Sequence, residues 1–130
     1  MTGILVLGEL LGGRPQPITR ELISAGRLLG EKLDEDVAVA FLGSEIDRVS
    51  CESTAGTADT VYFVENPLLG SSQIDLQLSA LEQMCIQADP SVVLVGKTSL
   101  GIDIGPRLAF RMGVGIAYDC IGIDVDSGTG

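Results

Sequence analysis

Short apolar runs alternate with longer amphipathic segments along the whole chain. Five runs are predicted as strands: Gly3–Leu7, Asp36–Leu42, Thr60–Val64, Ser91–Val95 and Ile116–Val125. Most of them are almost unbroken in apolar residues, which is typical of strands in a parallel sheet that is covered on both faces. Alternating strands and helices predict an α/β domain in three layers, with a parallel sheet and right-handed crossovers between its strands.

Four helices are predicted between the strands, at residues 19–33, 44–55, 72–88 and 104–112. Thr19 is the expected N-cap of the first helix, because its hydroxyl would accept a hydrogen bond from a free N–H of the first turn. The pair Asp89-Pro90 is expected to end the third helix. The fourth helix contains Pro106, which a helix tolerates in its first turn, so this helix is expected to begin near Ile104.

The composition is that of one globular domain. The chain has 130 residues, of which 45% are apolar and 20% are charged. Its apolar runs are far shorter than the about 20 residues that cross a bilayer. No basic region and no cleavage signal precede the first run. We therefore expect a protein without membrane contact, in the cytoplasm of a bacterium or in the mitochondrial matrix if the source is eukaryotic.

Charge and reactive side chains narrow the possible functions. A net charge of −10 argues against binding to nucleic acids or to anionic membranes. Histidine is absent from the sequence, which removes the usual general base and the commonest metal ligand. The three cysteines lie far apart in the sequence, so we expect buried, reduced thiols at Cys51, Cys85 and Cys120.

Two nucleotide-binding motifs are incomplete. The segment Gly96-Lys97-Thr98-Ser99 is similar to the end of a phosphate-binding loop, but Ser91 stands where that motif needs its first glycine. The residues between these two points are a predicted strand, which cannot wrap a phosphate. Gly113-Val114-Gly115 precedes a predicted strand instead of a helix, so it is not a dinucleotide-binding fingerprint. We therefore expect no cofactor-binding residues in this chain.

Carboxylates gather late in the chain, at Asp103, Asp119, Asp124 and Asp126. The segment Asp124–Gly128 has a faint likeness to a calcium-binding loop, but Gly128 stands where such a loop needs a ligand. A solvated strand end is the favoured interpretation. No acid and base are paired in a recognisable catalytic frame, so we expect neither catalytic nor metal-binding residues.

Three arginines are candidate contacts with a partner. Arg107 and Arg111 lie four positions apart and so share one face of the fourth helix, either beside surface acids or against another domain or subunit. Gly12-Gly13-Arg14 follows the first strand, where loops that contact ligands lie in open α/β sheets. We interpret it as a turn with an exposed arginine, with a ligand or partner contact as the alternative.

Several segments resemble a known family. The opening Ile4–Glu9, the helix Thr19–Arg27 and the segment Asp59–Tyr62 are similar to the beginning of electron transfer flavoprotein alpha subunits. The longest similar segment is Thr98–Ala109, which is followed by a glycine-rich turn and then by Asp119-Cys120. The order of these segments along the chain is also that of the family.

The resemblance implies an adenine-nucleotide-α-hydrolase-like (Rossmann-like) fold and an amino-terminal domain that spans residues 1–130. In this family FAD is held by a carboxy-terminal domain that lies outside this chain, and the partner beta subunit holds AMP or a second FAD. Ile102 stands where an arginine is usual, and Tyr118 where alanine is frequent. The first departure removes a positive charge that would affect the affinity for a partner rather than the fold.

The resemblance also implies a function. The domain would be a scaffold that packs on the beta subunit and supports the FAD domain of its own chain, a part of an electron carrier and not an enzyme. The complete heterodimer would carry electrons from flavin dehydrogenases to a quinone oxidoreductase or another acceptor. The alternatives are a stand-alone adenine-nucleotide-binding module of the same fold and a domain that serves only in oligomerisation.

Overall fold

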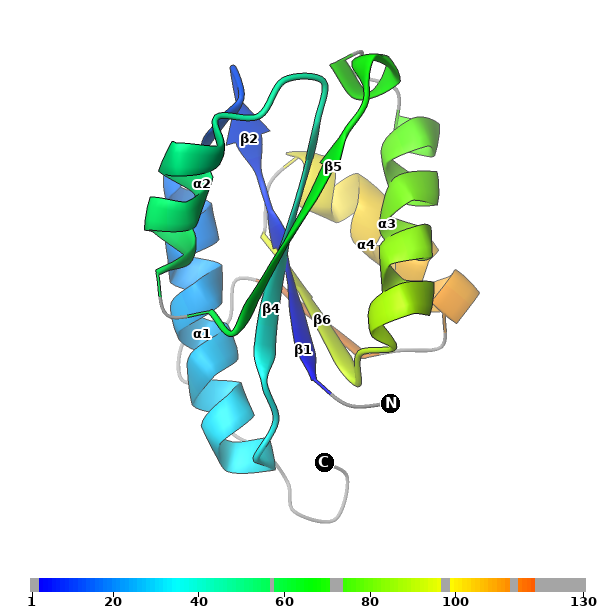
Figure 1. The fold of residues 1–130 in the computed structure, drawn as a ribbon. Coiled ribbons are helices and arrows are strands. Elements are labelled where there is room, and N and C mark those ends of the chain that lie inside the picture. The colour runs from blue at the N-terminus through cyan, green and yellow to red at the C-terminus, as the bar shows by residue number, and fades with distance from the viewer. Residues whose placement is uncertain (1–2, 57, 71–73, 97–98, 113–114, 119–130) are drawn as a thin grey trace.

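Five parallel strands form one sheet in the computed structural model, which describes residues 3–56, 58–70, 74–96, 99–112 and 115–118 (Figure 1). The strands are β1 (Ile4–Gly8), β4 (Val37–Gly43), β5 (Thr60–Glu65), β6 (Val92–Val95) and β7 (Gly115–Tyr118). Their spatial order is β5-β4-β1-β6-β7, and each neighbouring pair is parallel. The first strand of the chain therefore lies in the middle of the sheet.

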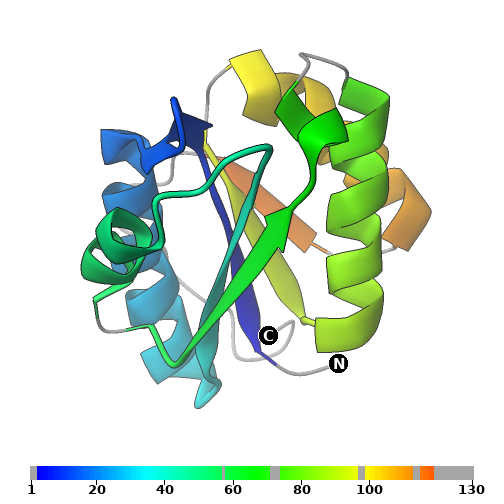
Figure 2. The same ribbon diagram turned by 45° about the horizontal axis from the view of Figure 1, so that its top comes forward.

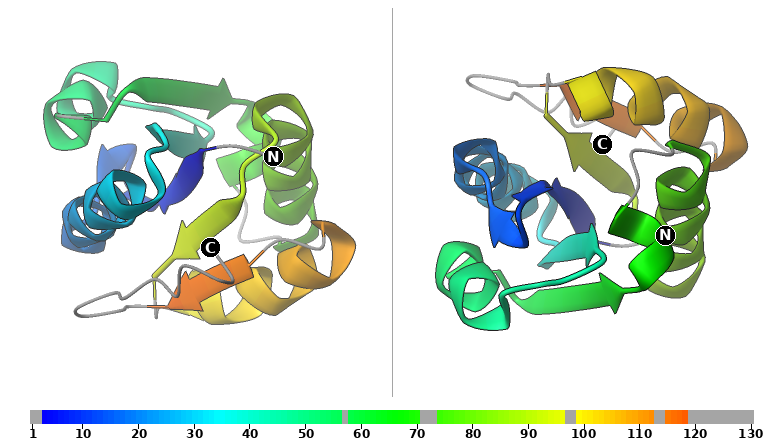
Figure 3. Two further views of the ribbon diagram at one scale, coloured as in Figure 1. Left: turned by 90° about the horizontal axis from the view of Figure 1, so that it is seen from below. Right: turned by 90° about the horizontal axis from the view of Figure 1, so that it is seen from above.

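Helices cover both faces of this sheet (Figures 2 and 3). α1 (Pro17–Leu33) and α2 (Arg48–Ala55) lie on one face, and α3 (Ile74–Ala88) and α4 (Ser99–Met112) lie on the other. Each pair of helices packs on the sheet in its own core, since buried side chains of α1 and α2 share one cluster and those of α3 and α4 share another. The predicted three-layer α/β fold with a parallel sheet is confirmed.

The central strand β1 contributes to both cores. All five of its residues are buried, and successive side chains of a strand point to opposite faces. Ile4 and Val6 pack with the helices α1 and α2, whereas Leu5 and Leu7 pack with α3 and α4. A strand covered on both faces has no position for a solvated side chain, which explains its unbroken apolar run.

The first two helices begin at other residues than predicted. α1 begins at Pro17, so Thr19 is not its N-cap but a residue of the first turn, fully buried. α2 begins at Arg48 instead of Ser44, because the Asp47 side chain accepts a hydrogen bond from the Ser50 N–H and caps the helix there.

The prediction for Pro106 was wrong. α4 begins at Ser99, which places Pro106 in the interior of the helix and not in its first turn. A proline inside a helix removes one hydrogen bond and crowds the carbonyl four residues earlier. The buried contacts of Ile104 and Leu108 on the same helix offset this cost. The predicted last strand extends to Val125, but its residues after Tyr118 lie outside the described residues.

Three short elements were not predicted. β2 (Leu10–Leu11) and β3 (Arg14–Pro15) form an antiparallel hairpin directly after β1. η1 (Pro67–Gly70) is one turn of 3₁₀ helix after β5. The predicted turn at Gly12-Gly13 is the loop of the hairpin, and both glycines have positive φ, at 60° and 80°.

Replacing Gly30 with alanine is expected to destabilise the domain. A Cβ at this position of α1 would lie 2.7 Å from the Glu35 carbonyl oxygen, a backbone atom that cannot move aside without displacing the start of β4. We expect Gly30→Ala to lower the free energy of unfolding by about 1–2 kcal/mol, although alanine favours helices more than glycine does. Equilibrium urea unfolding measures this change. Ser24→Ala, at an exposed position of the same helix, serves as the control and should not be destabilising.

Candidate functional site at the carboxyl ends of the strands

Ligands of open parallel sheets bind beyond the carboxyl ends of the strands, where the chain changes its direction of travel across the sheet. Here the chain runs from β1 through β4 to β5 in one direction, and then from β6 to β7 in the other. The change of direction lies between β1 and β6. A ligand site is therefore expected at the end of the sheet that contains Gly8 and Gly43.

A cavity of about 510 Å³ lies at this end of the sheet. The ends of β1 and β4, the β2–β3 hairpin, η1 and α3 all contribute to its wall. Its volume falls in the range of small-molecule sites. Its charged lining residues are two carboxylates, Glu9 and Glu45, and none of its described lining residues is a lysine or an arginine. Such a wall suits an anionic group such as phosphate poorly.

The glycines at this end are covered by the protein itself. A Cβ on Gly8 would lie 2.5 Å from the Phe41 ring, and a Cβ on Gly43 would lie 3.1 Å from the Leu10 side chain. In nucleotide-binding loops, glycines leave room for the backbone to approach a phosphate. In this chain the same room is taken by Phe41 and by the hairpin.

The base of the hairpin is held by a buried threonine. The Glu9 N–H donates to the Thr19 hydroxyl oxygen at 3.0 Å, and that hydroxyl donates in turn to the Glu9 carbonyl at 3.3 Å. The Gln16 N–H donates to the same carbonyl at 2.8 Å. Thr19 thus joins the end of β1 to the first turn of α1, which is why a residue predicted as a helix cap is buried.

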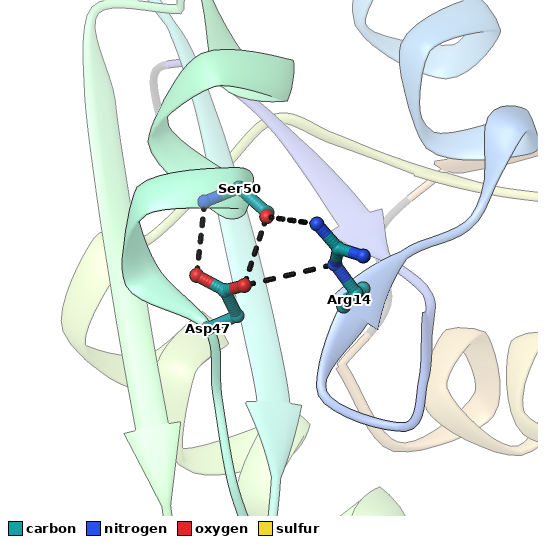
Figure 4. Close-up of polar contacts among 3 residues, drawn as sticks. All are labelled: Arg14, Asp47 and Ser50. Atoms are coloured by element: carbon teal, nitrogen blue, oxygen red, sulfur yellow. Dashed lines mark hydrogen bonds and ion pairs between the residues drawn. The ribbon is translucent and has the colours of Figure 1, made fainter.

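The tip of the hairpin is held by polar contacts with the start of α2 (Figure 4). The Asp47 N–H donates to the Gly13 carbonyl at 2.9 Å. The Arg14 guanidinium lies 3.6 Å from the Asp47 carboxylate and donates to the Ser50 hydroxyl at 3.5 Å. Asp47 also accepts hydrogen bonds from the Ser50 N–H at 3.2 Å and from its hydroxyl at 3.0 Å.

These contacts stabilise the charged form of Asp47. Hydrogen bonds from the Ser50 N–H and then from the Ser50 hydroxyl lower the pKa of Asp47 from its ordinary value of 3.8, and the charge of Arg14 adds to this effect. The ion pair with Arg14 is largely exposed, so water screens it. The cap of α2 and the attachment of the hairpin therefore depend on one carboxylate.

The three arginines predicted from the sequence are not brought together. Arg14 contacts α2 on one side of the sheet, while Arg107 and Arg111 lie on α4 on the other side. Arg111 forms an ion pair with Glu82 of α3 at 2.8 Å. This is the surface placement beside an acid that was one of the two interpretations of the pair.

A shallow depression of about 480 Å³ lies on the second half of α4. Leu78, Pro106, Arg107, Phe110 and Arg111 line it. Phe110 is 92% exposed and was missed in the sequence. Its signal is the helical period: Ile104 and Leu108 form the buried stripe of α4, and Phe110 falls outside that stripe.

The remaining candidates separate into structural roles. Ser91 lies at the amino end of β6, and the next four residues are the strand, so the interpretation of this segment as a strand and not a phosphate loop is confirmed. Cys51 and Cys85 are buried free thiols, as predicted, and burial raises the pKa of each to about 11. Asp103 is exposed. Cys120, Asp119, Asp124 and Asp126 lie outside the described residues, as do Lys97 and Thr98.

Metal sites and membrane-spanning helices are both absent from the described part of the chain. No group of three or more acidic, cysteine or histidine side chains is placed to hold a metal ion among the residues with described positions. Within the same residues, none of the helices has the length and apolar character needed to span a membrane.

Comparison with known families gives one clear match. The model of the electron transfer flavoprotein domain matches residues 4–129. The chain is 30% identical over 123 residues to the electron transfer flavoprotein subunit alpha of Thermoanaerobacterium thermosaccharolyticum, covering 95% of this chain and 37% of that protein. It is 30% identical over 125 residues to the corresponding subunit of Bacillus subtilis, with 96% and 38% covered. The chain thus spans little more than a third of these relatives.

Two further likenesses extend this picture. The acryloyl-CoA reductase electron transfer subunit beta of Anaerotignum propionicum is 33% identical over 106 residues, which are 82% of this chain and 29% of that protein. Among solved structures, a universal stress protein in complex with cAMP matches with a TM-score of 0.51 over 92% of this chain and 97% of that one. At 11% identity this second likeness concerns the fold alone, and it confirms the adenine-nucleotide-α-hydrolase-like class.

Replacing Asp47 tests the joint role of this carboxylate. Because the pKa of Asp47 is lowered in the folded state, its contribution to stability is present above the ordinary value of 3.8 and is lost as the pH falls through the lowered pKa. We expect Asp47→Ala to melt at a lower temperature than the wild type at pH 7, and this difference to shrink as the pH falls below 3.8. Thermal unfolding followed by circular dichroism measures it.

Glu52→Ala is the matched control, since Glu52 is an exposed acid of the same helix away from its cap. This variant should melt close to the wild type at pH 7 and also below pH 3.8. A difference between Asp47→Ala and the wild type that stays constant with pH would contradict the assigned role of the charge.

Proposed function

This chain belongs to the electron transfer flavoprotein domain family, and we propose that it is the amino-terminal scaffold domain of an alpha-type subunit. The observation that carries the proposal is the match of residues 4–129 to the family, at 37% of the length of an alpha subunit. Relatives named as alpha subunits align with nearly the whole chain. Nearly the whole chain therefore corresponds to one part of an alpha subunit.

The covered glycines support a scaffold role over a ligand-binding role. Phe41 and Leu10 occupy the room beside Gly8 and Gly43, and the cavity beyond them has an acidic wall. We propose that this domain holds neither flavin nor adenine nucleotide, and that it carries no catalytic and no metal-binding residue. Its part in the protein is then to fold stably and to offer surfaces to its neighbours.

The remaining parts of the proposal concern the complete protein. FAD would be held by a carboxy-terminal domain outside this chain, and a partner beta subunit would hold AMP or a second FAD. The heterodimer would carry electrons from flavin dehydrogenases to a quinone oxidoreductase or another acceptor, in the cytoplasm of a bacterium or in the mitochondrial matrix. In this role the chain is part of an electron carrier and not an enzyme.

We further propose that the outer face of α4 contacts the beta subunit. Arg107, Phe110 and Arg111 line a depression there, together with the buried Leu78. Arginine and aromatic side chains are enriched at protein interfaces. The contact proposed for Arg14 would be a separate one, because this residue lies at the hairpin and is engaged by Asp47 and Ser50.

Calorimetry with AMP, ATP and FAD distinguishes the scaffold from the nucleotide-binding module. We expect no heat of binding at micromolar concentrations from the 130-residue chain, and no flavin absorption after its purification. Micromolar binding of AMP or ATP would favour the stand-alone module. A stoichiometric flavin spectrum would contradict the proposal that FAD lies in another domain.

The variant Phe110→Asp tests the proposed contact with the beta subunit. Phe110 is 92% exposed, so the fold should tolerate the change, whereas a charge in the middle of an interface should weaken binding at least about tenfold. Biolayer interferometry of the tagged chain against the beta subunit of the same organism measures the affinity. Val49→Asp is the control, since Val49 is 79% exposed on α2, on the other side of the sheet. Equal affinities of both variants would place the interface elsewhere.

A further inference from the structure

We propose that the β2–β3 hairpin is a strap over the carboxyl-end cavity, which opens at its tip while its base and the sheet stay closed. The hairpin leaves β1 at Glu9 and returns to α1 at Gln16, and its residues from Leu10 to Gly13 form one wall of the cavity. Opening would widen the cavity without breaking a strand pair of the main sheet. The inference is independent of the proposed scaffold function.

The hairpin is weak as an isolated element. Each of its strands has two residues, and two-stranded hairpins of this kind are marginally stable in water at best. Its residue pairs are Leu10 with Pro15 and Leu11 with Arg14, and the proline has no N–H to donate. The closed position therefore depends on what the hairpin touches in the rest of the domain.

The two ends of the hairpin are attached very differently. At the base, Thr19 is fully buried and exchanges two hydrogen bonds with the backbone of Glu9. At the tip, one backbone hydrogen bond joins the Asp47 N–H to the Gly13 carbonyl, and the side chains of Arg14 and Asp47 are 72% and 42% exposed. Exposed ion pairs contribute little to stability, whereas buried hydrogen bonds are costly to break. The tip is therefore the end that opens.

Little apolar surface is lost when the tip opens. Leu11 at the tip is already 74% exposed, so it loses almost no burial. Leu10 is half-buried against the core of the α1–α2 side and lies over Gly43 at the end of β4. It directly follows Glu9 and so belongs to the end of the hairpin that stays closed. The positive φ angles of Gly12 and Gly13 place two residues with wide backbone freedom in the loop that must move.

Amide hydrogen exchange of the full chain measures the opening at single residues. The Asp47 N–H donates to the Gly13 carbonyl and so reports on the tip, the Glu9 N–H reports on the base, and the Ile4 N–H, bonded to the Asp36 carbonyl, reports on the sheet. We expect the Asp47 amide of the wild type to exchange at least about tenfold faster than the other two. Equal rates for all three would overturn the proposal, because the hairpin would then open only with the whole domain.

The variant Arg14→Ala tests whether the contacts of this guanidinium with Asp47 and Ser50 hold the tip closed. It should speed exchange of the Asp47 amide by up to about fivefold and leave the Glu9 and Ile4 amides unchanged. The Ser50 amide, bonded to the Asp47 carboxylate, should also keep its rate, since the helix cap does not need Arg14. An equal acceleration of the Ser50 amide would show that Arg14 acts on the helix cap. No acceleration of the Asp47 amide would show that Arg14 does not hold the tip closed. Either outcome overturns the role assigned to Arg14.

Two more variants complete the test. Arg20→Ala removes an exposed arginine of α1 and is the control, expected to change none of these rates. Thr19→Val removes the buried hydroxyl at the base and should speed the Glu9 amide as well as the Asp47 amide. Acceleration of Asp47 alone by Thr19→Val would contradict the assignment of Thr19 as the fixed base. If Thr19→Val does not fold, the wild-type rates and Arg14→Ala still decide.

Discussion

One carboxylate joins the beginnings of the three central strands. The Glu35 side chain, two residues before β4, accepts a hydrogen bond from the Gly3 N–H at 2.9 Å and from the Ser91 hydroxyl at about 3 Å. Gly3 precedes β1 and Ser91 precedes β6, so the loop before β4 is tied to both of the other strands. Together with the Ser91 N–H, which donates to the Gly3 carbonyl, it aligns the central strands at their amino ends. These contacts hold the amino ends of the same strands whose carboxyl ends lead into the hairpin and the wall of the cavity.

The irregular elements lie at the carboxyl ends of the strands. The hairpin follows β1 and the turn η1 follows β5, and the hairpin is attached by the buried Thr19 at its base and by contacts with the start of α2 at its tip. A fold of this kind tolerates changes of length and sequence at its carboxyl end without loss of the sheet. The same geometry places ligand sites there in related architectures. In this chain the end is instead covered by its own hairpin.

The sheet and its layers were predictable from the sequence, because a strand buried on both faces must be apolar throughout, as Ile4–Gly8 is. Details set by contacts distant in sequence were not. Thr19 was predicted as a helix cap because its hydrogen bond with Glu9, which lies before the hairpin, does not show in the local sequence. Pro106 was placed at a helix start because the burial of Ile104 and Leu108, which offsets the cost of an interior proline, does not show there either. The hairpin has strands of two residues, too short for any periodic signal. Of the site, the exposed arginines were predictable from charge, and Phe110 could have been found from its place outside the apolar stripe of Ile104 and Leu108.

The space beside Gly8 and Gly43 bears on the choice between a nucleotide site and a scaffold. A glycine leaves a gap the size of a side chain, and the gap can be taken by a phosphate or by the protein itself. Beside Gly8 the gap is taken by the Phe41 ring, which belongs to the buried core of the α1–α2 side and stacks on Phe63 at 5.9 Å. A ligand at this position would have to displace a core side chain, at the cost of the packing on that face. Core packing thus occupies the space that a phosphate would need beside Gly8, which supports the proposed scaffold role.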